Sequence, residues 1–553
     1  MQKALFFIIL FAALVRIAGI FYGLPLWLVD DEPPFILAAF KMLELKTLIP
    51  AFHAQEFATV LYYPPYLSYL FLPFFLIIAG IMFMFRPEDS AFGTYLLSDL
   101  SPFFAGARLL MVIASVASIY LLYRSAKEIF KNRLAGVLAA FFAATSLLYI
   151  ALSIVGRHWL SVFFVTTLVL FCLSHSAWSV KKRYTLAALA AGLGVGFAII
   201  NAISALLIAL WALLYEGHRV REVLRDIFWY KIAGFFFILA ALPVLLYPKG
   251  LGFAADATGA TAKSLWGMSA SPFSFASVLA ASEWVLLLFA ATGLFLAWRF
   301  ARNFFILSAA YLYSYSIVFY LIFRFEPRFF LGLLPFYFLL AGYGAALLLQ
   351  RTPQSLLHVG LGVLLFLPIL FSARLGVLAA RSDSRIFALQ FAQQHIPAGS
   401  KIFVLARLTY APTTHMAINE QTELDPDSVR SVQRAQAQVR EKTGEVAFHA
   451  LNLSDLNNEE FFENVTAYAR ENNYEYLLIQ PTLPAAKYFA QLVSNAELLA
   501  SFEGAPTQTR ECIACGSAPT TLSIAESQFI GNPFRLFSTK ELGPPIGIYR
   551  LQF

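Results

Sequence analysis

The chain has 553 residues, of which 59% are hydrophobic and only 13% charged, and its mean hydropathy is +0.69. A soluble globular protein carries roughly 25% charged residues, so this composition excludes an ordinary soluble protein and predicts an integral membrane protein. The net charge of +7 would favour nucleic acid as the partner of a soluble protein. Here the basic residues fall in short clusters between apolar runs, as membrane topology requires, and we expect no nucleic-acid partner.

The first element is an apolar run from Ala4 to Phe21, which follows Lys3. It is similar to a secretory signal peptide, but no A-x-A-like cleavage site follows it and Arg16 interrupts it. We interpret the run as an uncleaved transmembrane helix with its amino end in the cytoplasm.

Three adjacent acids come next, Asp30, Asp31 and Glu32, in the stretch LVDDEPPFILAAF. They have a structural interpretation, because the two prolines that follow can open a helix running to Leu45, with the acids at its cap and first turn. Acids near a membrane surface need no function when they are considered alone.

Further apolar segments follow along the chain, and a spanning helix needs about 20 such residues. Together with the first run they predict a polytopic α-helical membrane protein of about eleven to twelve transmembrane helices. The candidate spans are residues 4–22, 65–85, 103–123, 134–153, 158–178, 184–200, 202–216, 231–247, 277–298, 303–323, 328–349 and 355–378.

Basic clusters set the expected orientation, since Lys and Arg collect on the cytoplasmic side of membrane proteins. We place in the cytoplasm Arg124/Lys127/Lys131/Arg133, Lys181/Lys182/Arg183, His218 to Lys231, and Arg299/Arg302. The loops 23–64, 156–158, 248–276 and 324–328 then face the outer side, together with everything after about residue 380. The amino end and the cluster 124–133 are both expected in the cytoplasm, so an even number of crossings must separate them, yet three apolar segments do. We expect the segment 65–85 not to cross fully, because prolines open and interrupt it.

Three glycines, Gly192, Gly194 and Gly196, stand in the segment 184–200. Small residues at such spacing permit close helix packing in lipid. We prefer that interpretation to a G-x-G-x-G nucleotide loop.

After Arg381 the sequence becomes more polar. SDSRIFALQFAQQHIPAGSKIFVLARLTY predicts an amphipathic helix, a Pro-Gly turn and a strand, and NNYEYLLIQPT and IGIYRLQF predict two more strands. We therefore predict an extracytoplasmic α/β domain at residues 381–553, after a membrane domain at 1–380. Its cysteines, Cys512 and Cys515, fit a local disulfide or no role better than half of a zinc ribbon.

Two other stretches carry candidate chemistry. LYYPPYLSYL, residues 61–70, is typical of a proline-stiffened aromatic segment at the membrane interface. FRFEPRFFLGLLPFYFLLAGYGAALL, residues 323–348, places Arg324, Glu326 and Arg328 at the outer mouth of a helix. Ion pairing and snorkelling explain these charges without a function, although a guanidinium fork is also the natural partner of a phosphate.

Taken together and in order, these pieces resemble the GT-C glycosyltransferases, in particular the branch that contains protein O-mannosyltransferases and aminoarabinose transferases. The shared features are acids just after the first helix, a PPL-like step further along, and an RF…LP helix late in the bundle. The stretch ARLLMVIASVASIYLLYRSAKEIFKNRLAGVLAAFFAATS, from Ala107, also resembles the family's next two helices. The resemblance covers residues 1–380.

The resemblance implies a GT-C fold and an inverting sugar transfer at the outer face of the plasma (inner) membrane. The donor would be a polyprenyl-phosphate-linked sugar, and the acceptor a hydroxyl of an envelope lipid, glycan or protein. Asp31 matches the family's catalytic base, with Glu32 beside it, and Arg328 matches a basic residue at the carrier phosphate. Arg324 and Arg157, at the same outer mouth, are expected to bind the donor too.

The chain departs from the family at two places. Relatives often have Lys-Pro-Pro or His-Pro-Pro where this chain has Tyr63, Pro64 and Pro65, so a cation or imidazole is missing from this candidate substrate contact. Around IVGRHWL, residues 154–160, family members commonly carry another acid, whereas this chain has Arg157 and His158. His158 is a candidate metal ligand or phosphate contact, although a lone His at a helix mouth is more often structural. A divalent cation is a possible cofactor, but because this acid is missing we assign no residues to bind it.

A transporter or lipid flippase is the alternative function. Transporters usually show repeats and charged residues at mid-membrane, whereas this sequence shows no repeat and its charges gather at one outer surface. A structural anchor for residues 381–553 would not need so many apolar segments. The sugar, the acceptor and the oligomeric state are not specified by the sequence.

Overall fold

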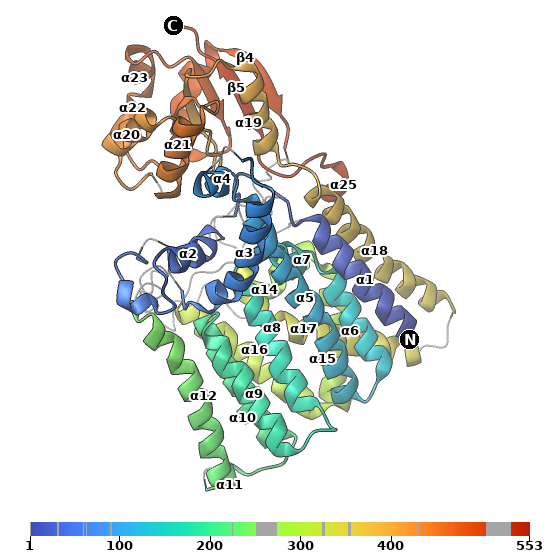
Figure 1. The fold of residues 1–553 in the computed structure, drawn as a ribbon. Helices are drawn as coiled ribbons and strands as arrows, with labels where there is room; N and C mark the ends of the chain where they lie inside the picture. Colours follow the sequence, from blue (N-terminus) through green and yellow to red (C-terminus); the bar gives the residue numbers. More distant parts are fainter. Residues whose placement is uncertain are drawn as a thin grey trace.

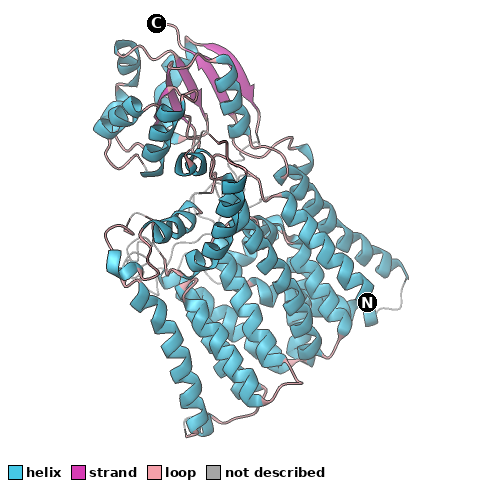
Figure 2. Ribbon diagram, viewed as in Figure 1, coloured by secondary structure: helices cyan, strands magenta, loops and turns pink. Residues whose placement is uncertain are grey.

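The computed structural model describes residues 2–29, 32–58, 60–61, 63–88, 91–223, 225–249, 274–322, 327–351, 355–429, 431–504 and 532–553. Long helices form a bundle, and a smaller α/β part sits at one end of it (Figure 1). Within the described residues, the strands all belong to this C-terminal part (Figure 2). The predicted fold class, a helical membrane protein with a C-terminal α/β domain, is confirmed.

Every predicted apolar segment contains a helix. These helices are α1 (Gln2–Ala18), α3 (Tyr66–Met84), α5 (Ser101–Phe130), α6 (Arg133–Thr145) with α7 (Leu147–Ser153), α8 (Trp159–Ser174), α9 (Val180–Val195), α10 (Ser204–Leu214), α12 (Ile227–Leu246), α14 (Ser274–Ser282) with α15 (Trp284–Phe300), α16 (Arg302–Ile322), α17 (Leu334–Arg351) and α18 (Ser355–Ala379). Shorter elements join them: α2 (Pro33–Glu44), η1 (Pro50–His53), α4 (Phe92–Ser98), η2 (Ile199–Ile203), α11 (Val220–Val223) and η4 (Pro327–Gly332).

Several helices have the length and surface of membrane spans. In the described parts of the chain, 4 helices are long and apolar enough to cross a membrane, or up to 5 if α6 and α7, bent by 62°, count as one span. One of the 4 is α3, so length and composition allow a crossing by the segment that we expected not to cross. Large apolar side chains such as Phe237, Ile238 and Leu245 of α12 are exposed, as lipid-facing positions require. The protein is an integral multi-pass membrane protein.

The predicted cytoplasmic loops gather at one end of the bundle. Ser176 donates to Glu128 at 2.7 Å, Arg183 pairs with Glu216 at 2.9 Å, and the Asn303 side chain donates to the carbonyl of residue 214 at 2.7 Å. These contacts tie together the loops after α5, α8, α10 and α15. Figure 1 shows α11 at this end and the sheet beyond the opposite end, as the distribution of basic clusters predicts.

The glycines of α9 are close-packed, which confirms their structural interpretation. An added Cβ would lie 2.8 Å from Leu239 at Gly192, 2.8 Å from Val165 at Gly194 and 2.0 Å from the Tyr66 ring at Gly196. Neighbouring helices therefore approach the α9 backbone where a side chain is missing.

A five-stranded sheet of order β2-β1-β3-β5-β4 organises the C-terminal part. Strand β1 pairs in parallel with β2 and β3, and β5 is antiparallel to β3 and β4. The strands are β1 (Lys401–Leu405), β2 (His449–Asn452), β3 (Tyr476–Ile479), β4 (Glu497–Phe502) and β5 (Ile546–Arg550). All four residues of β3 are buried, because apolar clusters cover both faces of the sheet.

Helices and short 3-10 turns surround the sheet. They are α19 (Ser384–His395), α20 (His415–Leu424), α21 (Ser431–Thr443), η5 (Leu453–Asp455), α22 (Glu459–Glu463), α23 (Val465–Glu471), η6 (Pro484–Phe489), α24 (Ala490–Ser494) and α25 (Arg535–Ser538). The predicted helix α19 and strands β1, β3 and β5 are confirmed. Strands β2 and β4 were not predicted. Cys512 and Cys515, and most of the predicted outer loop 248–276, lie outside the described residues.

Candidate active site

The acidic stretch lies where the chain enters α2. Glu32 occupies the N-cap position of α2, and two prolines open the helix, as the sequence predicts. The Glu32 side chain makes no capping hydrogen bond and is fully buried. Asp31, the predicted catalytic base, and Asp30 lie outside the described residues. Glu32 is therefore the one acid of the three whose contacts the structure gives.

Both oxygens of the Glu32 carboxylate are engaged. Arg108 of α5 donates from Nε to Oε1 and from Nη2 to Oε2, each at 2.7 Å, and the Gly156 amide donates to Oε1 at 2.6 Å. The remaining Arg108 nitrogen donates to the carbonyls of Ile20 and Tyr22. Such hydrogen bonds are what a buried charge pair needs to be stable, because they satisfy its lone pairs and protons. Glu32 therefore joins the start of α2 to α5 and to the loop after α7.

That loop carries His158 and Arg157, and both side chains are buried. The His158 ring lies 4.1 Å from the Tyr63 ring and 5.1 Å from the Phe35 ring, measured between centroids. Phe35 also stacks on Tyr63 at 5.6 Å. The aromatic contacts bring together α2, the segment before α3, and the loop before α8.

Arg157 and Arg328 both act electrostatically on His158, which lies just before α8 begins. Burial first, and then these two guanidinium groups, lower the pKa of His158 well below its ordinary value, which favours the neutral imidazole. Arg328 belongs to η4, which packs against α8. Arg324 and Glu326 lie outside the described residues. Two cations and one neutral imidazole thus meet beside the acid stretch.

The YPP step positions the start of α3. Pro64 and Pro65 are buried, and Pro65 is the N-cap of α3. The Tyr66 amide donates to the Gly196 carbonyl at 3.1 Å, and Ser68 donates from Oγ to the Phe35 carbonyl at 2.9 Å. The structure therefore brings Tyr63 and both prolines close to Arg157, His158 and Glu32.

Sequence reasoning missed two buried charges that support this site. One is Arg108, and the other is Glu283, between α14 and α15. Glu283 accepts hydrogen bonds from Ser146 Oγ at 2.9 Å and from the Leu148 amide at 2.8 Å, so it holds the start of α7, the helix that leads to Gly156. Both residues are charges inside a predicted apolar span, and that is the signal that would have identified them.

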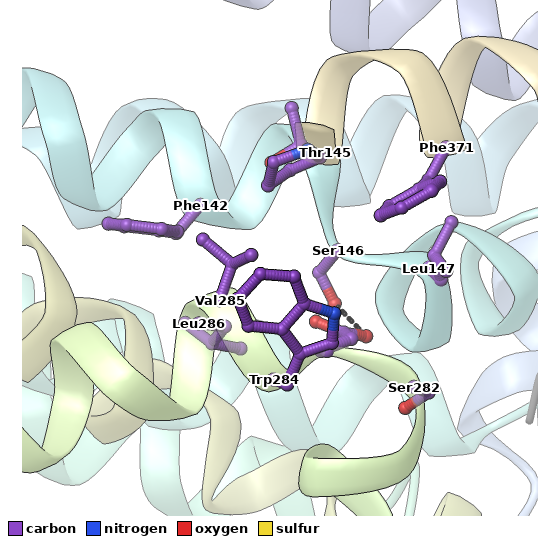
Figure 3. A pocket seen from close by; sticks show the side chains of 11 residues that line it. Phe142, Thr145, Ser146, Leu147, Ser282, Trp284, Val285, Leu286 and Phe371 are labelled. Atoms are coloured by element: carbon purple, nitrogen blue, oxygen red, sulfur yellow. Dashed lines mark hydrogen bonds between the residues drawn. The ribbon is translucent and has the colours of Figure 1, made fainter. Parts of the chain in front are cut away.

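Figure 3 shows the small cavity around the start of α7, with Phe142, Trp284 and Phe371 in its lining and the hydrogen bond from Ser146 drawn as a dashed line.

Arg16, which interrupts the first apolar run, is a comparable buried charge. It donates to Ser115 Oγ at 2.9 Å and to helix carbonyls. These contacts explain Arg16 as a link between α1, α5 and α6.

Metal ligands are not grouped in the part of the chain that the structure describes. Within it, no cluster of three or more His, Cys, Asp or Glu side chains is placed to hold an ion.

Comparisons with known proteins give one family match. Residues 90–247 match the model of the dolichyl-phosphate-mannose-protein mannosyltransferase family. The match covers less than half of the chain. It confirms the predicted resemblance to GT-C membrane glycosyltransferases and the predicted enzyme class, a glycosyltransferase. No curated protein sequence matches the chain.

Solved structures to which the chain is similar include the oligosaccharyltransferase of Archaeoglobus fulgidus in the apo form, with 14% identity, a TM-score of 0.47 and coverage of 89% of this chain and 71% of that one. ArnT from Cupriavidus metallidurans in the apo state has 10% identity and a TM-score of 0.45, over 85% of this chain and 90% of that one. The same protein bound to undecaprenyl phosphate has 12% identity and a TM-score of 0.43, over 89% and 96%.

Proposed function

We propose that this protein transfers a sugar, with inversion, from a polyprenyl-phosphate-linked donor to an acceptor hydroxyl of an envelope lipid, glycan or protein. The observation that carries the proposal is the meeting of Arg157, Arg328 and His158 beside the acid stretch. The family match over residues 90–247 supports the same reaction class. A lipid-linked donor suits a site that lies at one end of a membrane bundle.

Asp31 is the proposed general base. Its carboxylate takes the proton of the acceptor hydroxyl while the hydroxyl oxygen forms a bond to the anomeric carbon of the sugar. The bond from that carbon to the phosphate oxygen breaks, and the polyprenyl phosphate leaves with the electron pair. A positioned carboxylate contributes typically about 10²–10⁴-fold in rate to such a step.

The cations stabilise the leaving phosphate, on which negative charge accumulates. Arg328 takes the main role, with Arg157 and Arg324 beside it, because a guanidinium fork matches a phosphate with two parallel hydrogen bonds. The neutral imidazole of His158 can donate one more. Tyr63, Pro64 and Pro65 form the adjacent wall, where an aromatic ring and rigid backbone face the sugar or carrier.

Glu32 is better suited to positioning than to proton transfer. Oε1 accepts hydrogen bonds from Arg108 and Gly156, and Oε2 accepts one from Arg108, so taking up a proton would cost this carboxylate its buried ion pair. It anchors the peptide unit next to Asp31. Of the two acids predicted to be catalytic, we therefore propose Asp31 as the base and Glu32 as a positioning residue.

The reaction is proposed for the outer face of the plasma (inner) membrane. The site and the α/β part lie at the end of the bundle opposite the basic clusters (Figure 1), and such clusters favour the cytoplasm. The amino end is then cytoplasmic and residues 381–553 extracytoplasmic.

The test uses the full chain in lipid nanodiscs, with a polyprenyl-phosphate sugar labelled in both the sugar and the phosphate. Release of polyprenyl phosphate together with labelled acceptor or free sugar is the expected result. The control is the Asp31→Asn variant in the same lipid. Movement of the intact donor across vesicle membranes without cleavage would instead support a flippase and overturn the proposal.

A further inference from the structure

One hydrogen bond joins the end of the first helix to the start of the α/β part. Tyr22, in the turns that follow α1, donates from its hydroxyl to Asp383 Oδ2 at 2.5 Å. Asp383 is the N-cap of α19 and pairs with Arg385 at 2.7 Å. Tyr22 is 2% exposed, and Asp383 and Arg385 are fully buried, so this contact is shielded from water.

Tyr22 also contacts the arginine that holds Glu32. Its backbone carbonyl accepts a hydrogen bond from Arg108 Nη1 at 2.7 Å. A continuous chain of buried polar contacts therefore runs from Arg385 and Asp383 through Tyr22 to Arg108 and Glu32. Its members come from the α/β part, the segment after α1, α5 and the acid stretch.

Apolar packing follows the same path. Leu28 and Val29, just before the acids, are fully buried. They belong to one apolar cluster with Leu408, Leu536 and Leu542 of the α/β part and with Ile154 and Val155 before Gly156. The end of the segment 23–29 thus packs between the α/β part and the loop that carries Arg157 and His158. Turns, rather than a helix or strand, make up this segment.

We infer that Tyr22 and Asp383 are positioning residues through which the α/β domain restrains the segment 23–29 and Glu32, on either side of Asp30 and Asp31 in the sequence. The inference rests on the proposed function of Asp31. A segment made of turns has few internal restraints, so its position depends on what it packs against. Catalytic groups must be held closely, since a displacement of about 1 Å costs on the order of 10²-fold in rate. The α/β domain is therefore part of the active-site framework.

The first test measures hydrogen exchange of the full chain in nanodiscs. Tyr22→Phe removes only the hydroxyl that contacts Asp383, and we expect faster exchange in peptides covering residues 23–34. The matched control is Tyr474→Phe, which removes a buried hydroxyl that donates to Glu420 at 2.7 Å within the α/β part. The control should leave residues 23–34 as in the wild type. Unchanged exchange in Tyr22→Phe would overturn the inference.

The second test measures turnover of the same variants with a polyprenyl-phosphate sugar. Tyr22→Phe should lower kcat on the order of 10-fold and change the donor KM less than twofold, because the phosphate contacts stay in place. Asp383→Asn should act in the same direction, and the double variant should lose no more than Asp383→Asn alone, since both break one link. If the losses in kcat of the two single variants add up in the double variant, the contact between Tyr22 and Asp383 has no positioning role. The same holds if Tyr22→Phe and Tyr474→Phe have equal kcat.

The two tests separate this inference from the proposed function. If the wild-type protein releases no polyprenyl phosphate, the proposed function fails, while the exchange comparison still decides whether the α/β part restrains residues 23–34. If the wild type is active and Tyr22→Phe matches it in both tests, the positioning role fails alone.

Discussion

Arg108 holds Glu32 through two parallel hydrogen bonds of 2.7 Å each, and both side chains are buried. The pair connects the first third of α5 to the start of α2. It also fixes the Gly156 amide on Glu32 Oε1 at 2.6 Å. Three segments of the proposed site therefore depend on one ion pair.

Replacing Arg108 alone should strongly destabilise the protein. Arg108→Met leaves the Glu32 charge buried without its partner, and breaking a buried pair in this way costs about 3–5 kcal/mol. The free energy of unfolding in detergent micelles measures the loss. The double variant Glu32→Leu, Arg108→Met should recover most of it, because two apolar groups need no partners, yet it should stay inactive. A double variant as unstable as Arg108→Met would contradict this account.

Asp31→Asn should abolish turnover while the protein still inserts and binds donor. The amide keeps the size of the side chain and cannot take the proton, so we expect a loss of about 10²–10⁴-fold in kcat. Asp30→Asn is the matched control and should stay near the wild-type rate. If the control loses activity and Asp31→Asn does not, the base is the neighbouring residue. If both are active, the acids serve only the start of α2.

Gly156→Ala should lower activity through Glu32. An added Cβ would lie 3.0 Å from Glu32 Oε1 and 3.2 Å from the Ala107 Cβ, which forces the carboxylate or the loop to shift by a few tenths of an ångström. Gly234→Ala on α12 is the control, because nothing lies within 4 Å of its added Cβ. The measurement is kcat of both variants relative to the wild type, at a temperature at which both variants are folded. We expect the lower kcat in Gly156→Ala. Equal rates would show that the Gly156 contact is not needed.

Arg328→Ala should weaken donor binding more than it lowers the rate of sugar transfer from the bound donor. The substitution removes a charge beside His158, and Arg328→Lys, which restores the charge without the fork, should recover only part of the affinity. Titration with a non-transferable donor analogue gives the dissociation constants. Full recovery in Arg328→Lys would mean that a point charge suffices, and wild-type affinity in Arg328→Ala would remove this residue from the site.

The α/β part should lose stability in acid through Glu420. Burial opposes the ionisation of Glu420, but hydrogen bonds from His449, Tyr468 and Tyr474 outweigh it and lower its pKa to about 2, against an ordinary value of 4.5. Because the folded pKa is depressed, the stabilisation is present above pH 4.5 and is lost as the pH falls from there towards 2.

Glu420→Gln should therefore flatten the loss of stability in that acid window, relative to the wild type. The control is Glu423→Gln, an exposed position on the same helix, which should keep the wild-type slope. Calorimetric unfolding of the full chain as a function of pH gives the measurement. Identical slopes for Glu420→Gln and the wild type would refute the role of this cluster.

Part of the site could be predicted because its residues are unusual for their surroundings. Arg328 and the YPP step stand out next to apolar segments, and the structure brings them to the same end of the bundle. The role of Asp31, which lies outside the described residues, stays a prediction. Arg108 and Glu283 carried the same kind of signal, since each is a charge within an apolar span. Their partners were not predictable, because nothing local in the sequence specifies which distant carboxylate or helix start a buried charge will meet.

The sequence by itself determined the helices, the strands β1, β3 and β5, and the membrane character of the protein. These features follow from the length, periodicity and composition of short segments, which act locally. The tertiary structure alone decided the contacts between distant residues, such as Glu32 with Arg108, 76 positions apart, and Tyr22 with Asp383, 361 positions apart. Packing of whole helices and the α/β part against each other brings these pairs together, because a buried charge or hydroxyl is stable only where the fold supplies a partner.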